Sequence, residues 1–434
     1  MNLRSPLVAA FVLTPGPIVY AQAPLLQDGA SSLRQARLDW TAGNPPLAPS
    51  SLPSFEAGWG GAESQGSYAP LADGEGLGHG TQGWGLGFQG RYTSGGWRMS
   101  ATVLALRDRG RTTGILQRAS LAYQTESGWR TALEQTPLAW GTGLNGGDLL
   151  GDAARPFPRL SLATPEVRLP LGRWRMEAFA GRLEADPPIP DWIPDRDSRT
   201  AAQAAGFGLR RPGLWGGLLR AAFAEHLELN AGAVSMEGGQ TAQGQAASNA
   251  AKRIRTLVEA RLRLPALARL AQARGASVHA SRSAQTEGGA LSLASGRTLA
   301  GLQLVWEGWD LGAEYAGATP RGMSGPFLQP AYLAGFSTHG DPLGSAFGPQ
   351  ILTRTLELGL PLFLEGQGRL KAVRATAALD HPSGASSWFL QAEGQWRTPT
   401  GRIGASVASR RNAYPGPAIR WGWTFSIFQA FRVF

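Results

Sequence analysis

The chain has 434 residues, a net charge of +10 and no cysteine. Without cysteine it has neither a disulfide scaffold nor a thiolate metal site, and no stretch approaches the about 20 consecutive apolar residues of a transmembrane helix. Arginine carries almost all of the positive charge, because Lys252 and Lys371 are the only lysines. Such a charge favours anionic solutes or acidic polysaccharide as partners. Nucleic acid is not expected, since no basic helix or aromatic binding motif accompanies the charge.

Residues 1–23 are predicted to be a secretory signal peptide. Arg4 gives a basic start, the run from Leu7 to Leu13 is apolar, and Ala21-Gln22-Ala23 offers a cleavage site of small residues. A cut after Ala21 stays open as an alternative, because proline follows the site directly. The chain is therefore expected to be exported.

Residues 24–53 are predicted to be a short periplasmic segment. Ser31 or Ser32 can cap one helix in it, and Gly43 ends that helix. The helix would carry Leu33, Ala36, Leu38 and Trp40.

From Ser54 onward the sequence predicts β-hairpins. Apolar and polar residues alternate in short runs, and side chains alternate across a strand, so each run has one apolar face. Most turns between paired runs contain glycine, which accepts the positive φ that tight turns need. An aromatic residue recurs beside the turn, where an interfacial girdle would lie, at Trp97, Trp129, Trp174 and Trp309.

The connections between the predicted strands alternate in length. Wide connections are expected near residues 61–82, 108–112, 137–163, 185–203, 236–251, 283–293, 318–350, 381–386 and 411–416. Tight turns are expected between them, near 93–96, 125–128, 171–172, 212–214, 264–266, 307–308, 365–368 and 398–400. These connections imply about 18 strands, with short periplasmic turns and long outer loops, as is typical of bacterial outer-membrane barrels. Residues 54–434 are therefore predicted to be an all-β, transmembrane outer-membrane β-barrel in the cell outer membrane, in contact with its lipid.

The segment from Ala251 to Ser281 is ambiguous, because its apolar residues fit a strand at first and then also fit a helix.

The last predicted strand runs from Arg420 to the end of the chain. One face carries Trp421, Trp423, Phe425, Ile427, Phe431 and Val433. The terminal Phe434 predicts recognition by the barrel assembly machinery, although it is out of phase with the apolar face and Arg432 replaces the usual aromatic two positions earlier. The last strand of a soluble β-protein is the alternative.

The less apolar face of the strands is predicted to line the lumen and to be basic. Arginines recur on this parity, at Arg98, Arg118, Arg130, Arg253 and Arg255. A basic lumen or mouth would attract anionic solutes.

No catalytic, metal or cofactor site is predicted. None of the histidines lies within four residues of another, so no local metal-ligand pair exists. The motif Gly322-Met-Ser324-Gly325 is one residue short of a nucleophile elbow. A hydrolase at the barrel rim, using His226 or His279, remains a third class of function.

The connection from Glu134 to Glu166 is the most informative. Five glycines let it fold tightly, and Pro156 and Pro158 stiffen its exit around Phe157. It is predicted to hold a defined shape, folded inward as a plug.

Motifs in and after this connection resemble the Wzi family of capsule-assembly outer-membrane proteins. They are Trp140-Gly-x-Gly, Ala154-Arg-Pro-Phe-Pro158, Leu171-Gly-Arg-Trp174 with Phe179 to Glu184, and Gly206 to Pro212 with Leu227-Glu-Leu-Asn230. The resemblance covers about residues 50–240. It implies an 18-stranded barrel, a periplasmic helical bundle and non-catalytic attachment of capsular polysaccharide. The N-terminal segment departs from this pattern, since it is short and proline-rich for a full bundle.

We therefore expect a barrel that binds and anchors acidic or neutral capsular or exopolysaccharide at the cell surface. Indole faces stack on sugar rings and arginine forks pair with acidic groups, so the candidate binding residues are Trp140, Arg155, Phe157, Arg159 and Trp192. For each of them, packing of the loop or a place in the interfacial girdle is the alternative. The alternative function is a diffusion porin for anionic or sugar solutes.

Overall fold

The computed structural model describes residues 30–42, 54–66, 83–108, 111–138, 140–145, 149–150, 156–185, 196–205, 208, 210–240, 253–287, 290–292, 296–318, 337–338, 341–342, 351–364, 366–377, 386–399, 401–412 and 420–432. No helix in this part of the chain is long and apolar enough to cross a membrane.

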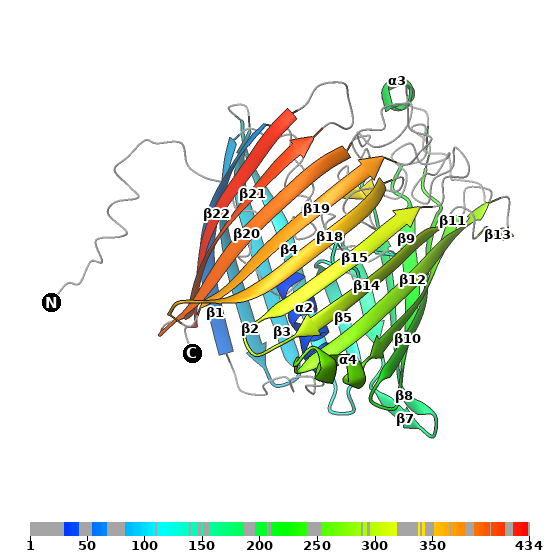
Figure 1. The fold of residues 1–434 in the computed structure, drawn as a ribbon. Helices are drawn as coiled ribbons and strands as arrows, with labels where there is room; N and C mark the ends of the chain where they lie inside the picture. Colours follow the sequence, from blue (N-terminus) through cyan, green and yellow to red (C-terminus); the bar gives the residue numbers. More distant parts are fainter. Residues whose placement is uncertain are drawn as a thin grey trace.

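One large antiparallel sheet closes on itself to form a barrel (Figure 1). Its strands are β1 (Ser54–Gly66), β2 (Gly83–Ser94), β3 (Trp97–Asp108), β4 (Arg111–Gln124), β5 (Arg130–Gln135), β6 (Arg159–Ala163), β7 (Val167–Leu169), β8 (Gly172–Arg182), β9 (Gly213–Phe223), β10 (Leu227–Glu237), β11 (Arg253–Arg263), β12 (Gly275–Glu287), β13 (Ala290–Ser292), β14 (Arg297–Val305), β15 (Asp310–Ala318), β18 (Ile351–Leu362), β19 (Gly366–Ala377), β20 (Ser386–Thr398), β21 (Gly401–Asn412) and β22 (Arg420–Arg432).

Two strands of the wall are interrupted. Both β6 and β7 pair with β8, and both β13 and β14 pair with β12, so the segments make 18 antiparallel strands. The first and last strands close the barrel, from the pair Glu56–Arg432 to the pair Gly66–Gly422. The predicted strand number is confirmed.

The structure contains few helices. They are α2 (Ala30–Ala42), α3 (Arg196–Ala204) in a wide connection and α4 (Pro265–Leu270) in the connection between β11 and β12. The predicted N-terminal helix is present and ends before Gly43, but it begins at Ala30, so Ser31 and Ser32 lie inside its first turn and do not cap it. The segment from Ala251 to Ser281, which fits both a strand and a helix in sequence, contains both, because β11 is followed directly by α4. A small hairpin, β16 (Ser337–Thr338) and β17 (Asp341–Pro342), lies in the connection after β15.

Two predicted turns are wrong. A tight turn is expected near 264–266, but β11 ends at Arg263, α4 occupies Pro265–Leu270 and β12 begins only at Gly275. Arg211-Pro212-Gly213 predicts a tight turn, but β9 begins at Gly213 and the tight turn to β10 occupies residues 224–226. Ala224 has a positive φ of 50° in that turn. A non-glycine residue rarely takes this conformation, so the sequence carries no glycine signal there.

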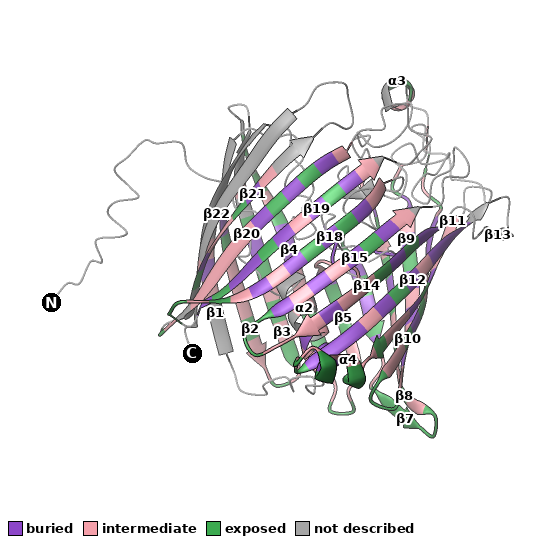
Figure 2. Cartoon of the chain, in the orientation of Figure 1, coloured by how far each residue is buried: buried purple, intermediate pink, exposed green. Residues whose placement is uncertain are grey.

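Burial alternates along the strands (Figure 2), and the residue types show that its sense is opposite to that of a soluble protein. In β6, Arg159 and Ser161 are 3% and 9% exposed, whereas Leu160 and Leu162 are 56% and 45% exposed. Apolar side chains thus face outward and polar ones inward, as a wall between lipid and water requires. The arginines predicted to line the lumen lie on the inward-facing parity, and two of them, Arg118 and Arg255, are buried there.

The aromatic face of β22 and the terminal Phe434 lie outside the described side chains. The assembly signal therefore stays a prediction.

Candidate functional site in the barrel lumen

We call the connection between β5 and β6, residues 136–158, the lumen loop, and its described residues 140–145 and 149–150 lie inside the barrel. In its described part, Trp140 and Leu150 pair through the backbone, with Trp140 N donating to Leu150 O at 2.9 Å. Trp140, Leu149 and Leu150 are at most 2% exposed. The prediction of an inward-folded loop is confirmed for these residues.

Apolar contacts hold one side of the lumen loop. Trp140 packs on Phe179 of β8 with ring centroids 5.1 Å apart, and Phe157 packs on the same ring at 5.9 Å. Leu149 and Leu150 belong to the same buried cluster. Gly216 of β9 makes room for it, because a Cβ there would lie 2.9 Å from the indole ring of Trp140. The inner wall at β8 and β9 is therefore shaped for this loop.

Charged side chains of the wall hold the other side. Thr142 N donates to Glu259 Oε2 of β11 at 2.7 Å, and Leu144 N donates to Glu314 Oε2 of β15 at 2.5 Å. Lys371 Nζ of β19 donates to Leu144 O at 2.6 Å. These wall residues are more than 100 positions away in sequence. Hydrogen bonds to charged groups contribute about 1.5–3 kcal/mol each, so the backbone of the loop is strongly held.

Asn145 completes this attachment. Its Nδ2 donates to Thr355 Oγ1 of β18 at 2.5 Å and lies 3.5 Å from Glu314 Oε1. The lumen loop thus contacts the inner wall from β8 round to β19, and it occupies the lumen between them.

The helix α2 also lies inside the barrel (Figure 1). Arg34 pairs with Glu357 at 2.8 Å and with Asp310 at 2.5 Å, and Arg37 pairs with Glu357 at 3.2 Å. Arg369 of β19 lies 3.9 Å from the same Glu357 carboxylate. Because Glu357 is 1% exposed, these charges interact with little screening by water.

The end of α2 packs tightly on the wall. Trp40 lies against the guanidinium groups of Arg261 and Arg263. The Cζ atoms of these arginines are 4.2 and 4.6 Å from the centroid of the Trp40 ring. Thr41 Oγ1 and Ser277 Oγ are 2.9 Å apart, and a Cβ on Gly275 would collide with the Thr41 carbonyl. The helix and the lumen loop are thus two separate occupants of the lumen.

The candidate binding residues are only partly described. Trp140, Phe157 and Arg159 are buried and lie close together, because Arg159 stacks 5.6 Å from the Phe157 ring and pairs with Glu134 at 3.2 Å. These contacts are packing contacts within the loop and its exit. Arg155 and Trp192 lie outside the described residues. The binding role stays a prediction for all five.

Sequence reasoning missed the wall residues that hold the two occupants, which are Glu259, Glu314, Glu357 and Lys371. A signal was present, since all lie mid-strand on the parity that faces inward. A carboxylate at such a position needs a partner inside.

Histidine chemistry has little support. His226 lies exposed in the tight turn before β10, and His279 Nε2 is 3.5 Å from Glu314 Oε2 inside the wall. Within the described ranges, His, Cys, Asp and Glu side chains form no group suited to a metal. His79, His339, His381 and Ser324 lie outside those ranges.

Trp140→Ala is expected to lower the free energy of unfolding by about 3 kcal/mol, because the cavity left by a buried indole does not fully collapse. Urea unfolding in phospholipid vesicles measures this change. The control is Trp129→Ala, whose side chain is 43% exposed beside a tight turn. A loss in Trp140→Ala no larger than in this control would contradict the packing role.

A closed antiparallel barrel with an apolar exterior, a polar interior, tight turns at one end and wide connections at the other defines the protein as an outer-membrane β-barrel. Solved structures agree. Wzi of Escherichia coli, an outer-membrane protein involved in group 1 capsule assembly and a carbohydrate-binding β-barrel, aligns with a TM-score of 0.63 and 15% identity over 92% of this chain and 88% of Wzi.

Other barrels have the same fold. OccAB2 of Acinetobacter baumannii aligns with a TM-score of 0.53 and 9% identity, over 88% of this chain and 98% of its own. The outer-membrane protein OpdK of Pseudomonas aeruginosa aligns with a TM-score of 0.52 and 10% identity, over 88% and 99%. The sequence matches no protein-family model and no curated protein sequence. At these identities the similarity establishes the fold alone.

Proposed function

We propose that this outer-membrane barrel is a non-catalytic protein, distantly related to the Wzi proteins, that binds capsular or exopolysaccharide and helps to anchor it at the cell surface. The observation that carries the proposal is the occupied lumen. The lumen loop is held by Glu259, Glu314 and Lys371, and α2 is held by Glu357. A lumen filled by two attached segments suits a surface anchor better than a diffusion pathway.

The same loop supplies the binding surface in this proposal. Phe157 and Arg159 are buried anchors at the exit of the loop, and Arg155 precedes them by two and four positions. In this proposal the guanidinium fork of Arg155 pairs with a uronate or another acidic group. Trp192, in the next wide connection, would stack on a sugar ring.

Arg155→Ala is expected to weaken binding of the purified barrel to acidic glycans on an array by about tenfold or more, because a charge-assisted hydrogen bond contributes about 1.5–3 kcal/mol. The matched control is Arg168→Ala, an exposed arginine in β7 beside a tight turn, which should bind as the wild type does. Absence of binding by the wild type to any acidic glycan would overturn the proposal.

The cellular test is surface retention of polymer in a deletion strain. Polymer shed into the medium at unchanged total synthesis supports anchoring, and restoration by the wild type but not by Arg155→Ala ties it to the loop. Unchanged retention would reject the role.

A diffusion porin for anionic or sugar solutes is the second candidate. It is favoured by the basic side chains that face inward, such as Arg118, Arg255 and Arg297, each at most 4% exposed. Ion conductance separates the two functions.

A further inference from the structure

Two arginines face outward on the lipid side of the wall. Arg354 of β18 and Arg374 of β19 are register partners, and both side chains are exposed. Arg374 lies 5.7 Å from the ring of Trp388 on β20. Among the described side chains, no carboxylate pairs with Arg354 or Arg374.

These arginines lie near one end of the barrel. Arg354 lies near the start of β18, just after the wide connection that follows β15. Arg374 lies near the end of β19, just before the next wide connection. Wide connections mark the extracellular end of such barrels. The two guanidinium groups therefore face the outer leaflet close to its headgroup region, where a cation on the lipid face is tolerated better than at the midplane.

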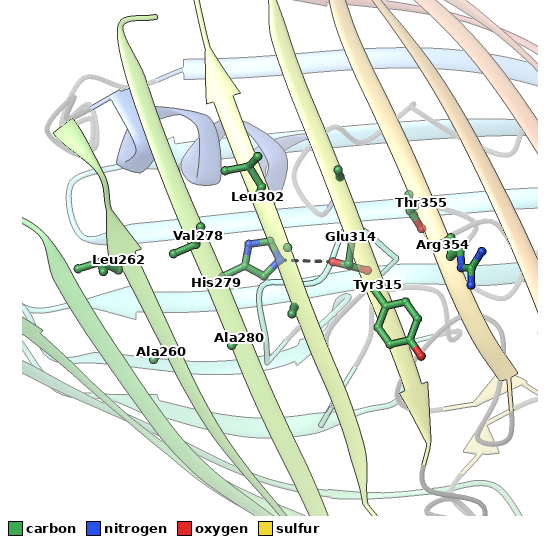
Figure 3. Close-up of a pocket in the computed structure, with 13 residues that line it drawn as sticks. Ala260, Leu262, Val278, His279, Ala280, Leu302, Glu314, Tyr315, Arg354 and Thr355 are labelled. Atoms are coloured by element: carbon green, nitrogen blue, oxygen red, sulfur yellow. Dashed lines mark ion pairs between the residues drawn. The ribbon is translucent and has the colours of Figure 1, made fainter. Parts of the chain in front are cut away.

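An open apolar groove adjoins the arginines on the same outer face (Figure 3). Its volume is about 770 Å³. Its apolar lining consists of Leu262, Val278, Leu302, the ring of Tyr315 and the alanines Ala260, Ala280, Ala300 and Ala313. Arg354 and three residues of the inward-facing parity, His279, Glu314 and Thr355, also line it. Register places Ala300 beside Tyr315 and Tyr315 beside Arg354. The groove thus runs along the wall and ends at a phenol and a guanidinium.

We propose that this groove and the two arginines bind the phosphorylated, acylated glycolipid of the outer leaflet. An acyl chain would lie in the groove, and the phosphate of the headgroup would accept hydrogen bonds from Arg354 and Arg374. Three properties support this occupant: the apolar lining suits a hydrocarbon chain, the guanidinium forks match a phosphate in charge and geometry, and basic pockets at membrane surfaces recognise anionic headgroups. The proposal does not depend on polysaccharide binding.

The test measures binding of bis-phosphorylated lipid A to the full-length purified barrel in detergent by native mass spectrometry. We expect Arg354→Gln/Arg374→Gln to bind this lipid about tenfold more weakly than the wild type does. Arg168→Gln at the opposite end of the wall should bind as the wild type does. The wild type should bind the dephosphorylated lipid and phosphatidylglycerol weakly.

A second variant tests the groove without changing charge. Ala280→Leu/Ala300→Leu fills the outward face beside Tyr315 and should also weaken binding, whereas Ala101→Leu, outward on β3, should not. Heat-modified migration on gels verifies that each variant is folded. Unchanged binding in the double arginine variant, or equal binding of the dephosphorylated lipid or of phosphatidylglycerol, would overturn the proposal.

Discussion

Replacing Glu259 and Glu314 together by alanine is expected to raise the ion conductance of the barrel in planar bilayers by about tenfold or more. The two carboxylates accept hydrogen bonds from Thr142 N and Leu144 N of the lumen loop. Hydrogen bonds to charged groups contribute about 1.5–3 kcal/mol each, and every 1.4 kcal/mol changes a population tenfold. The loop should therefore leave the wall often enough to open the lumen, whereas the wild type should pass little current.

Two further variants sharpen this experiment. Glu259→Gln/Glu314→Gln keeps an acceptor oxygen at each position and should raise the conductance less. Glu307→Ala removes a carboxylate from an exposed tight turn and should leave it unchanged. If the folded double alanine variant conducts no more than the wild type, the loop does not close the lumen. A wild type that already conducts strongly would favour the porin function.

Glu357→Ala is expected to lower the free energy of unfolding by about 3 kcal/mol, because it removes the carboxylate that pairs with Arg37 in a buried site, whereas Arg34 keeps Asp310 and Arg369 keeps Glu393. It should also release α2 from the wall. Urea unfolding in vesicles measures the first effect, and hydrogen exchange of residues 30–42 measures the second.

The contrast is Glu166→Ala. The pair between Glu166 and Arg173 is 3.4 Å long and almost half exposed on both sides, so its loss should cost about 0–1 kcal/mol. An equally small effect of Glu357→Ala, with α2 still protected from exchange, would show that the buried cluster does not hold the helix.

The architecture was accessible from the sequence because strand signals are local. An alternation of apolar and polar residues reports a strand with two different faces, and connection length reports which end of a barrel a turn lies on. These signals were sufficient for the number of strands and most of their turns. These signals missed the turn at Ala224, because that turn forms without glycine. They also predicted a turn at Arg211-Pro212, where strand β9 begins at the next residue.

The candidate site was predicted only in outline. Glycine and proline content indicated that the segment after Glu134 holds a shape and folds inward. It did not indicate that Trp140 and Phe157 would be buried, because their burial depends on contacts with Phe179 of β8 and, for Trp140, on the space left by Gly216 of β9. Nor did it indicate that Arg159 would be buried against Glu134. The two other candidates, Arg155 and Trp192, lie outside the described residues.

The sequence by itself determined the class of fold, because side chains alternate between the two faces of a strand and the alternation of apolar and polar residues is visible in the sequence. Only the tertiary structure decided what fills the barrel. The partners of the lumen loop and of α2 lie on strands that are 100 to more than 300 positions away, and no local pattern encodes such pairings. Closure of the sheet brings the inward carboxylates of β11, β15 and β18 around one space, and there they hold the loop and the helix.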